Sequence, residues 1–215
     1  MLRLIIFDLD GTIVDSSIDI TNAINYAIKP LGMKPVQPSD TIKIVGEGIT
    51  RLIEKLLPEE LSEDRAETTK RFIDYYSAHL LDFTRAYPHV EEVLKALNDY
   101  KRAVISNKRE GLSISILDGL GLLRYFDLIL GSDSAGAKKP SPIPVQRVMD
   151  CLGARAEETI IVGDSNLDIE AGKAAHIRTI AVTYGYRPRD VLMDADFMID
   201  DMVDLIKVVK LLQNG

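Results

Sequence analysis

Two carboxylates, Asp8 and Asp10, stand two residues apart directly after the apolar run 4–7. A buried strand that ends in two like charges is unfavourable unless a cationic group compensates them, because burial penalises the charged form. The simplest compensation is a divalent metal ion with oxygen ligands. We therefore expect the chemistry of this protein to centre on the carboxyl end of its first strand.

Short apolar runs rich in β-branched residues predict strands that are buried on both faces. These runs are residues 2–7, 102–105, 128–130, 159–162 and 179–182. From residue 88 onward they alternate with helical patterns at about 88–100, 109–119, 141–152 and 166–175. This alternation predicts βαβ units and an α/β fold with a parallel sheet covered by helices. A short strand at 197–199 and a helix at about 202–212, with Asp201 as its candidate N-cap, complete the pattern.

The segment between the first two predicted strands shows no strand pattern. It contains helical patterns at about 16–29, 47–57 and 62–81, with prolines between them as breaks: Pro30, Pro35, Pro38 and Pro58. This organisation predicts a small α-helical cap domain at residues 16–82, inserted into a core domain of residues 1–15 and 83–215.

Polar residues at the strand ends are the candidate site, because ligands of an open parallel sheet bind beyond the carboxyl ends of its strands. They are Asp8 and Asp10 after the first strand, Ser106, Asn107 and Lys108 after the second, Lys139 after the third, and Asp164 and Asp168 after the fourth. Each group alone has a structural explanation, such as a helix cap or a solvated lysine. Their coincidence at one edge of one sheet indicates a functional site.

The residue types at this edge favour phosphoryl chemistry. Asp8 and Asp164 offer the hard oxygen ligands that Mg²⁺ prefers, and no paired Cys or His near these loops suggests zinc. Lys139 offers a positive charge and Ser106 a hydroxyl to a phosphoryl oxygen. A carboxylate in such a site can attack phosphorus and form an aspartyl-phosphate that water later cleaves.

The run 8–12, Ser106, the pair 139–140 and Asp164 with Asp168 resemble, in this order, the four motifs of the haloacid dehalogenase (HAD) superfamily. The resemblance covers residue 3 to about residue 200. It implies a Rossmann-like parallel-sheet core with a helical cap inserted after the first strand. It also implies a Mg²⁺-dependent reaction at the four motifs.

The resemblance implies a role for each motif carboxylate. Asp8 is the expected nucleophile, and Asp10 is the expected general acid and base. The side chains of Asp8 and Asp164, together with the main-chain carbonyl of Asp10, are the expected Mg²⁺ ligands.

Other motif residues are expected to act on the phosphoryl group. Ser106 and Lys139 would hold it, and Asp168 would act indirectly by orienting Lys139 or a metal-bound water. Thr12 and Asn107, which stand within or beside the first two motifs, are candidates for contact with substrate.

Comparison within the superfamily narrows the reaction. Asp10 favours phosphoryl transfer over dehalogenation, since halide leaves without a proton. Mutases of the β-phosphoglucomutase type place a His just after the first motif, whereas residues 15–20 contain none. The stretches 87–90, 106–108, 139–142, 183–186 and 45–48 are similar to phosphoglycolate phosphatases. A pyrophosphatase or a mutase-like phosphotransferase remains the alternative.

The predicted cap contains two further candidates for substrate binding. Gly46 and Gly48 bracket a turn before a helix, so that main-chain amides near Gly48 could approach a ligand. Arg51, one turn later, is a candidate partner for a substrate carboxylate. A solvated Arg51, or one paired with Glu47, is the alternative.

Composition limits the partners. A net charge of −7 over 215 residues argues against nucleic acid, and no apolar run is long enough for a membrane span. The single cysteine excludes an intramolecular disulfide and fits a reducing compartment. We expect a cytoplasmic monomer or weak homodimer that acts on a small phosphorylated metabolite. A phospho-accepting receiver module is disfavoured, because its acceptor would end the third strand, where this chain has Gly131.

Overall fold

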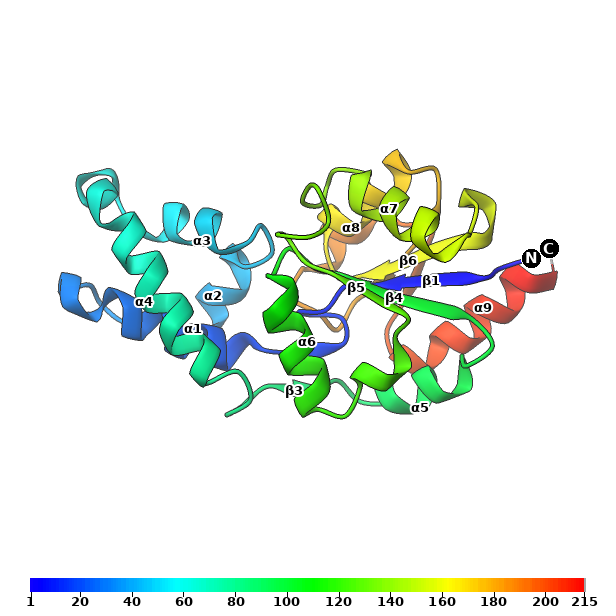
Figure 1. Cartoon of the computed structure of the whole chain (residues 1–215), viewed down its shortest axis with the longest axis horizontal. Coiled ribbons are helices and arrows are strands. Elements are labelled where there is room, and N and C mark those ends of the chain that lie inside the picture. Colours follow the sequence, from blue (N-terminus) through cyan, green and yellow to red (C-terminus); the bar gives the residue numbers. More distant parts are fainter. Residues whose placement is uncertain (215) are drawn as a thin grey trace.

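A parallel sheet of six strands lies at the centre of the computed structural model, which describes residues 1–214 (Figure 1). Its strands are β1 (Leu4–Phe7), β4 (Lys101–Ile105), β5 (Leu128–Leu130), β6 (Thr159–Gly163), β7 (Arg178–Val182) and β8 (Phe197–Ile199). The order across the sheet is β5-β4-β1-β6-β7-β8, and every neighbouring pair is parallel. The predicted α/β fold with a parallel sheet is confirmed.

Strand β1 occupies the interior of this sheet, between β4 and β6. Its side chains alternate between two apolar clusters, with Ile5 and Phe7 in one and Leu4 and Ile6 in the other. This is the burial expected of a parallel strand that is covered on both faces. Because the chain order changes direction beside β1, the crevice at its carboxyl end is the expected ligand site.

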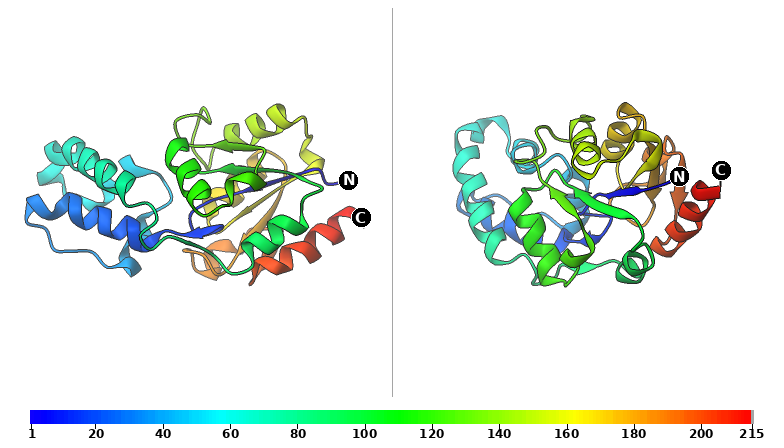
Figure 2. Two further views of the ribbon diagram at one scale, coloured as in Figure 1. Left: turned by 60° about the horizontal axis from the view of Figure 1, so that its bottom comes forward. Right: turned by 45° about the vertical axis from the view of Figure 1, so that its right-hand side comes forward.

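Helices cover both faces of the sheet, as Figures 1 and 2 show. They are α5 (Val90–Ala96), α6 (Glu110–Gly119), α7 (Ile143–Leu152), α8 (Asn166–Ala174) and α9 (Leu205–Asn214). Apolar residues of α5, α6 and α9 pack with Ile5 and Phe7, whereas those of α7 and α8 pack with Leu4 and Ile6. Asp201 accepts a hydrogen bond from the Val203 amide, which confirms the predicted cap before the last helix.

Four further helices lie together beyond the carboxyl ends of the strands (Figure 1). They are α1 (Ser17–Ile28), α2 (Pro38–Ile44), α3 (Ile49–Leu56) and α4 (Arg65–Ala78). The chain enters and leaves this group through a small antiparallel pair, β2 (Val14–Asp15) and β3 (Arg85–Ala86). The pair lies near the domain boundaries expected at residues 15–16 and 82–83, which stay a prediction. None of the helices at residues 1–214 combines the length and the apolar character that crossing a bilayer requires.

Helix α2 corrects one expectation. Pro38 was expected to break helical structure, but it is the first residue of this helix. Proline is tolerated at that position because the first N–H of a helix has no intrahelical partner. The strands β2 and β3 were also missed, since two-residue strands carry no periodic pattern.

Asp19, in the first turn of α1, ties the two connections between the helical group and the sheet to each other. Its buried carboxylate accepts hydrogen bonds from the Phe83 amide at 3.0 and 3.1 Å. The same carboxylate accepts from the Thr84 amide at 2.8 Å and from the Thr84 hydroxyl at 2.7 Å. The outgoing and returning chains are therefore joined by one side chain.

We expect Asp19→Ala to lower the free energy of unfolding by about 3 kcal/mol, because the buried donors of Thr84 and the partly buried amide of Phe83 lose their acceptor. Chemical denaturation of both proteins would measure this difference. Asp74→Ala, at an exposed position of α4, is the matched control and should leave the midpoint within error. Equal midpoints for the two variants would contradict the structural role of Asp19.

Candidate active site

A buried lysine stands between two carboxylates at the carboxyl end of β1. The Lys139 ammonium lies 2.7 Å from Asp8 Oδ1 and 2.6 Å from Asp168 Oδ1, and its side chain is only 3% exposed. The second oxygen of Asp168 accepts hydrogen bonds from the Ser165 hydroxyl at 2.6 Å and the Ser165 amide at 3.2 Å. The expected contact of Asp168 with Lys139 is therefore present, and Asp168 also caps α8.

The charges of this site do not cancel. Burial raises the pKa of Asp8 to about 7; Lys139 opposes this shift, while Asp168 and Asp10 add to it. Burial and the neighbouring charges of Asp8 and Asp168 also raise the pKa of Asp164 well above its usual range. Burial acts to lower the pKa of Lys139, but its carboxylate partners outweigh burial and raise it. An additional cation here would favour the ionised carboxylates.

The oxygen donors of the site suit Mg²⁺. Asp8, Asp164 and Asp168 each bring one carboxylate oxygen to within 4.8 Å of the others. Asp168 is already engaged by a lysine and a helix cap, which leaves Asp8 and Asp164 as the available carboxylates. No main-chain amide of residues 1–214 donates to the Asp10 carbonyl, so that oxygen is also available. Gly11, at φ +88°, has no space for a Cβ, which would collide with the Asp164 carboxylate.

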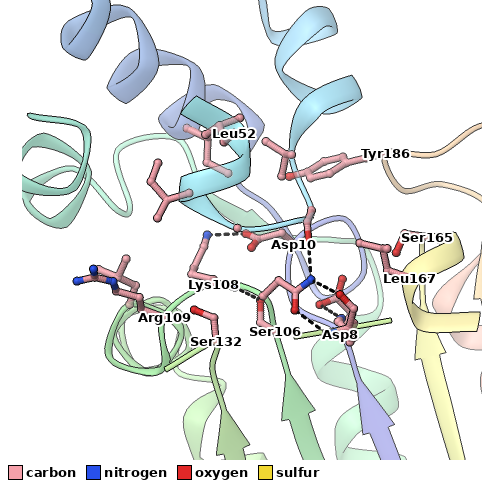
Figure 3. A pocket seen from close by; sticks show the side chains of 18 of the residues that line it. Asp8, Asp10, Leu52, Ser106, Lys108, Arg109, Ser132, Ser165, Leu167 and Tyr186 are labelled. Carbon is pink, nitrogen blue, oxygen red and sulfur yellow. Dashed lines mark hydrogen bonds and ion pairs between the residues drawn. The ribbon is translucent and has the colours of Figure 1, made fainter. Parts of the chain in front are cut away.

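Two side chains hold the Asp10 carboxylate: Ser16, which the sequence pattern does not indicate, and Lys108, which it places at this edge without a role. Asp10 Oδ1 accepts a hydrogen bond from the Ser16 hydroxyl at 2.5 Å. The same oxygen pairs with the Lys108 ammonium at 2.7 Å, as Figure 3 shows. Lys108 also donates to the Tyr76 hydroxyl of α4 at 2.7 Å. Burial acts to lower the pKa of Lys108, but Asp10 and Tyr76 outweigh it and raise the pKa. Lys108 therefore stays charged and links the sheet edge to the inserted helices.

The loop after β7 supplies a second unexpected contact. The Tyr186 amide donates to Asp164 Oδ2 at 2.6 Å, and the Tyr186 hydroxyl accepts from the Ser16 amide at 3.0 Å. In the sequence, stretch 183–186 is marked only by its similarity to phosphoglycolate phosphatases, and nothing local relates it to Asp164.

The two residues after β4 have different environments. Ser106 is 3% exposed and lies at the wall of the cavity that contains Asp8 and Asp10. The Asn107 amide group accepts from the Lys139 amide at 2.9 Å and donates to the Lys139 carbonyl at 3.0 Å and the Gly46 carbonyl at 2.9 Å. Asn107 lines the cavity, but its side-chain oxygen and nitrogen already hold two loops together. Contact between Asn107 and substrate stays a prediction.

A cavity of about 90 Å³, measured as the space open to the centre of a water molecule, adjoins these residues. One water needs roughly 10–15 Å³ of this measure, so the space suits a small metabolite. The sheet edge provides the polar wall, which includes Asp8, Asp10, Ser106, Lys108, Lys139 and Asp164. The inserted helices and their turns provide an apolar wall of Ile20, Val45, Ile49, Leu52, Phe72 and Ile73.

Of the remaining candidates, Gly48 lines this cavity and Thr12 and Arg51 do not. The Thr12 side chain is fully buried, its Oγ1 has no hydrogen-bond partner within residues 1–214, and the Thr12 carbonyl accepts from the Tyr184 hydroxyl. Arg51 has a side chain that is 64% exposed and pairs with Glu54 at 2.7 Å. Direct substrate contact by Thr12 and Arg51 is therefore not supported. Glu47, the partner suggested for Arg51, pairs with Lys55 instead.

Comparisons with known proteins agree with this geometry. The chain is 40% identical over 210 residues to a phosphoglycolate phosphatase of Aquifex aeolicus, with 97% of each chain covered. It is 38% identical to a phosphoglycolate phosphatase of Neisseria meningitidis, with 94% of this chain and 89% of the relative covered. A crystal structure of a predicted phosphoglycolate phosphatase from Haemophilus somnus superposes with a TM-score of 0.90 at 30% identity, covering 97% and 98% of the two chains. The family model of haloacid dehalogenase-like hydrolases matches residues 5–182, and the chain belongs to this family.

Proposed function

We propose that the chain is a Mg²⁺-dependent phosphatase that hydrolyses a small phosphomonoester, with 2-phosphoglycolate as the preferred substrate. The observation that carries the proposal is the buried row Asp8–Lys139–Asp168 beside Asp164, at the polar wall of the cavity. The names of the relatives, phosphoglycolate phosphatases at 38–40% identity over nearly the whole chain, support the substrate.

The oxygen donors described above would hold Mg²⁺ through Asp8, Asp164 and the Asp10 carbonyl. When bound there, Mg²⁺ would neutralise charge on a phosphoryl oxygen and on the ionised carboxylates. Lys139 stabilises the ionised form of Asp8, and the third hydrogen of its ammonium is available to the phosphoryl group. The Ser106 hydroxyl, at the cavity wall, donates to a second phosphoryl oxygen.

The reaction proceeds in two steps on the carboxylates of the chain. An Asp8 oxygen attacks phosphorus, the bond from phosphorus to the ester oxygen breaks, and protonated Asp10 gives its proton to that oxygen. Ionised Asp10 then takes a proton from water, whose oxygen attacks the same phosphorus. The phosphorus–Asp8 bond breaks, and inorganic phosphate leaves. Ser16 and Lys108 fix the position of the Asp10 carboxylate through both steps.

Charge in the cavity supports a substrate with a second anionic group. Lys108 lines the cavity, its side chain is 8% exposed, and its ammonium faces the inserted helices through Tyr76. 2-Phosphoglycolate carries a carboxylate in addition to its phosphoryl group, and it has few enough atoms for the small cavity. A buried ammonium is a suitable partner for that carboxylate.

The alternative reactions of the superfamily differ from the proposed function in what they require. A Schiff-base reaction needs an inserted-helix lysine in the site, but none of Lys29, Lys34, Lys43 and Lys55 lines the cavity at the described residues. Lys43 pairs with Asp40 at the surface. A mutase needs a sugar bisphosphate for activation, and a pyrophosphatase needs no organic leaving group, so assays separate both from the proposed function.

The test of the proposed function is phosphate release from a panel of esters that contains 2-phosphoglycolate, pyrophosphate and β-glucose 1-phosphate. We expect 2-phosphoglycolate to give the highest kcat/KM. We also expect chelation of divalent metal to abolish turnover and added Mg²⁺ to restore it. Preference for pyrophosphate would indicate a pyrophosphatase instead. Turnover only after activation by a sugar bisphosphate would indicate a mutase. No release from any ester by folded protein would overturn it.

Asp8→Asn should reduce kcat by about 10⁴-fold or more, because an amide cannot attack phosphorus. Acid-quenched samples with ³²P-labelled substrate should contain labelled wild-type protein but no labelled variant. Asp99→Asn, at an exposed position outside the cavity, is the control and should match the wild type. Turnover by Asp8→Asn near the wild-type rate would exclude Asp8 as the nucleophile.

Asp10→Asn should reduce kcat by about 10²- to 10⁴-fold, the usual contribution of a general acid and base. With p-nitrophenyl phosphate, whose leaving group needs no proton, the first step should survive and the water step should be slow. A burst of nitrophenolate equal to the enzyme concentration is the expected signature. A steady rate without a burst, at the wild-type level, would show that Asp10 transfers no proton.

A further inference from the structure

The loop after β7 reaches from the sheet edge to the end of α2. The two terminal nitrogens of the Arg187 guanidinium donate hydrogen bonds to the carbonyls of Ile42 and Val45. Carbonyls in the last turn of a helix lack intrahelical partners, and a guanidinium near them is also favoured by the helix dipole. One side chain therefore satisfies two acceptors at the carboxyl end of α2.

Two other side chains from the sheet edge hold the next residues of the same segment. Asn107, after β4, donates to the Gly46 carbonyl at 2.9 Å. Lys138, in the loop after β5, donates to the Glu47 carbonyl at 3.4 Å. Together with Arg187 they form what we call the carbonyl clamp: three donors from three loops, bound to main-chain oxygens within residues 42–47.

The carbonyl clamp holds this segment as close to the sheet edge as its main chain permits. A Cβ on Gly48, where φ is +85°, would lie 3.0 Å from the Asn107 carbonyl and from the Lys138 ammonium. A Cβ on Gly46, where φ is +122°, would lie 3.3 Å from an Arg187 nitrogen. The glycines thus permit the close approach, and the clamp donors maintain it.

The clamped turn is also part of the cavity wall. Val45, Gly46 and Gly48 line the cavity, and α3, which begins directly after them, adds Ile49 and Leu52. Figure 1 shows the turn between α2 and α3 reaching toward the loops at the strand ends. The position of the clamp therefore sets how far the apolar wall stands from Asp8 and Asp10.

We propose that Arg187 is a positioning residue that determines substrate size: by fixing the turn at residues 45–48, it restricts the cavity to phosphomonoesters with a small leaving group. This inference rests on the proposed function and names the residue that limits its substrates. Because the clamp acts on main-chain oxygens, it fixes the position of the turn whatever side chains the turn carries. Without the two hydrogen bonds of the Arg187 guanidinium, the turn can move away from the sheet edge. The cavity then contacts small esters less closely and admits larger ones.

The test compares the ratio of kcat/KM for 2-phosphoglycolate to kcat/KM for 1-naphthyl phosphate in four proteins: the wild type, Arg187→Ala, Arg187→Lys and Arg189→Ala. For Arg187→Ala we expect the ratio to fall by about tenfold or more, mainly through a higher KM for the small ester. The ratio for Arg187→Lys should lie between those of the wild type and Arg187→Ala, since the lysine ammonium can reach one of the two carbonyls. Arg189, which pairs at the surface with Asp200 at 2.8 Å, is the matched control and should keep the wild-type ratio.

Hydrogen exchange of the peptide that contains residues 42–48 provides a readout independent of turnover. Exchange there should be faster in Arg187→Ala than in the wild type and unchanged in Arg189→Ala. If Arg187→Ala does not fold, Arg187→Lys decides the inference by both measurements.

The outcomes separate this inference from the proposed function. A wild type that releases phosphate from no ester would overturn the proposed function before the variants are compared. An active wild type whose Arg187 variants lose activity equally toward both esters, or whose segment 42–48 exchanges at the wild-type rate, would overturn only the inference.

Discussion

The active-site region depends on the compensation of buried negative charge by Lys139. Asp8, Asp164 and Asp168 meet at the end of β1, and burial raises the pKa of Asp8 and Asp164. Lys139 touches Asp8 and Asp168 but not the third carboxylate, so a deficit of positive charge remains. This deficit is the physical reason that the site suits Mg²⁺ and a phosphoryl group. A neutral residue at position 139 would leave three buried carboxylates without a cation.

The two halves of the cavity contribute different chemistry. Strand ends provide every carboxylate and lysine at the polar wall, because parallel strands bring their carboxyl ends to one edge. The inserted helices provide an apolar wall together with the Tyr76 hydroxyl, which holds Lys108 beside Asp10. Chemistry and substrate size are therefore controlled by separate elements. Arg187 and Asn107, at the sheet edge, bind main-chain carbonyls of the inserted helices and their turn. The position of that turn therefore does not depend on which side chains it carries.

Sequence patterns predicted the strands of the sheet within one or two residues at each end, because buried parallel strands are continuous apolar runs. The same patterns placed Asp8, Ser106, Lys139 and Asp164 at one edge, since residues that follow parallel strands must meet there. They missed α2, whose seven residues begin at a proline. They also left open whether Arg51 contacts substrate or solvent, and its side chain lies at the surface. A short helix and an exposed arginine carry too little periodicity to be distinguished by pattern alone.

The sequence by itself determined the fold class, the edge of the sheet that carries the chemistry and the identity of the motif carboxylates. Local apolar runs and the residues that follow them are sufficient for these conclusions. Only the tertiary structure decided the partners: Lys108 for Asp10, Tyr186 for Asp164, and Arg187 for the end of α2. Each of these contacts joins loops far apart in the chain. Their geometry depends on how the helices and the sheet pack, which no local pattern of residues specifies.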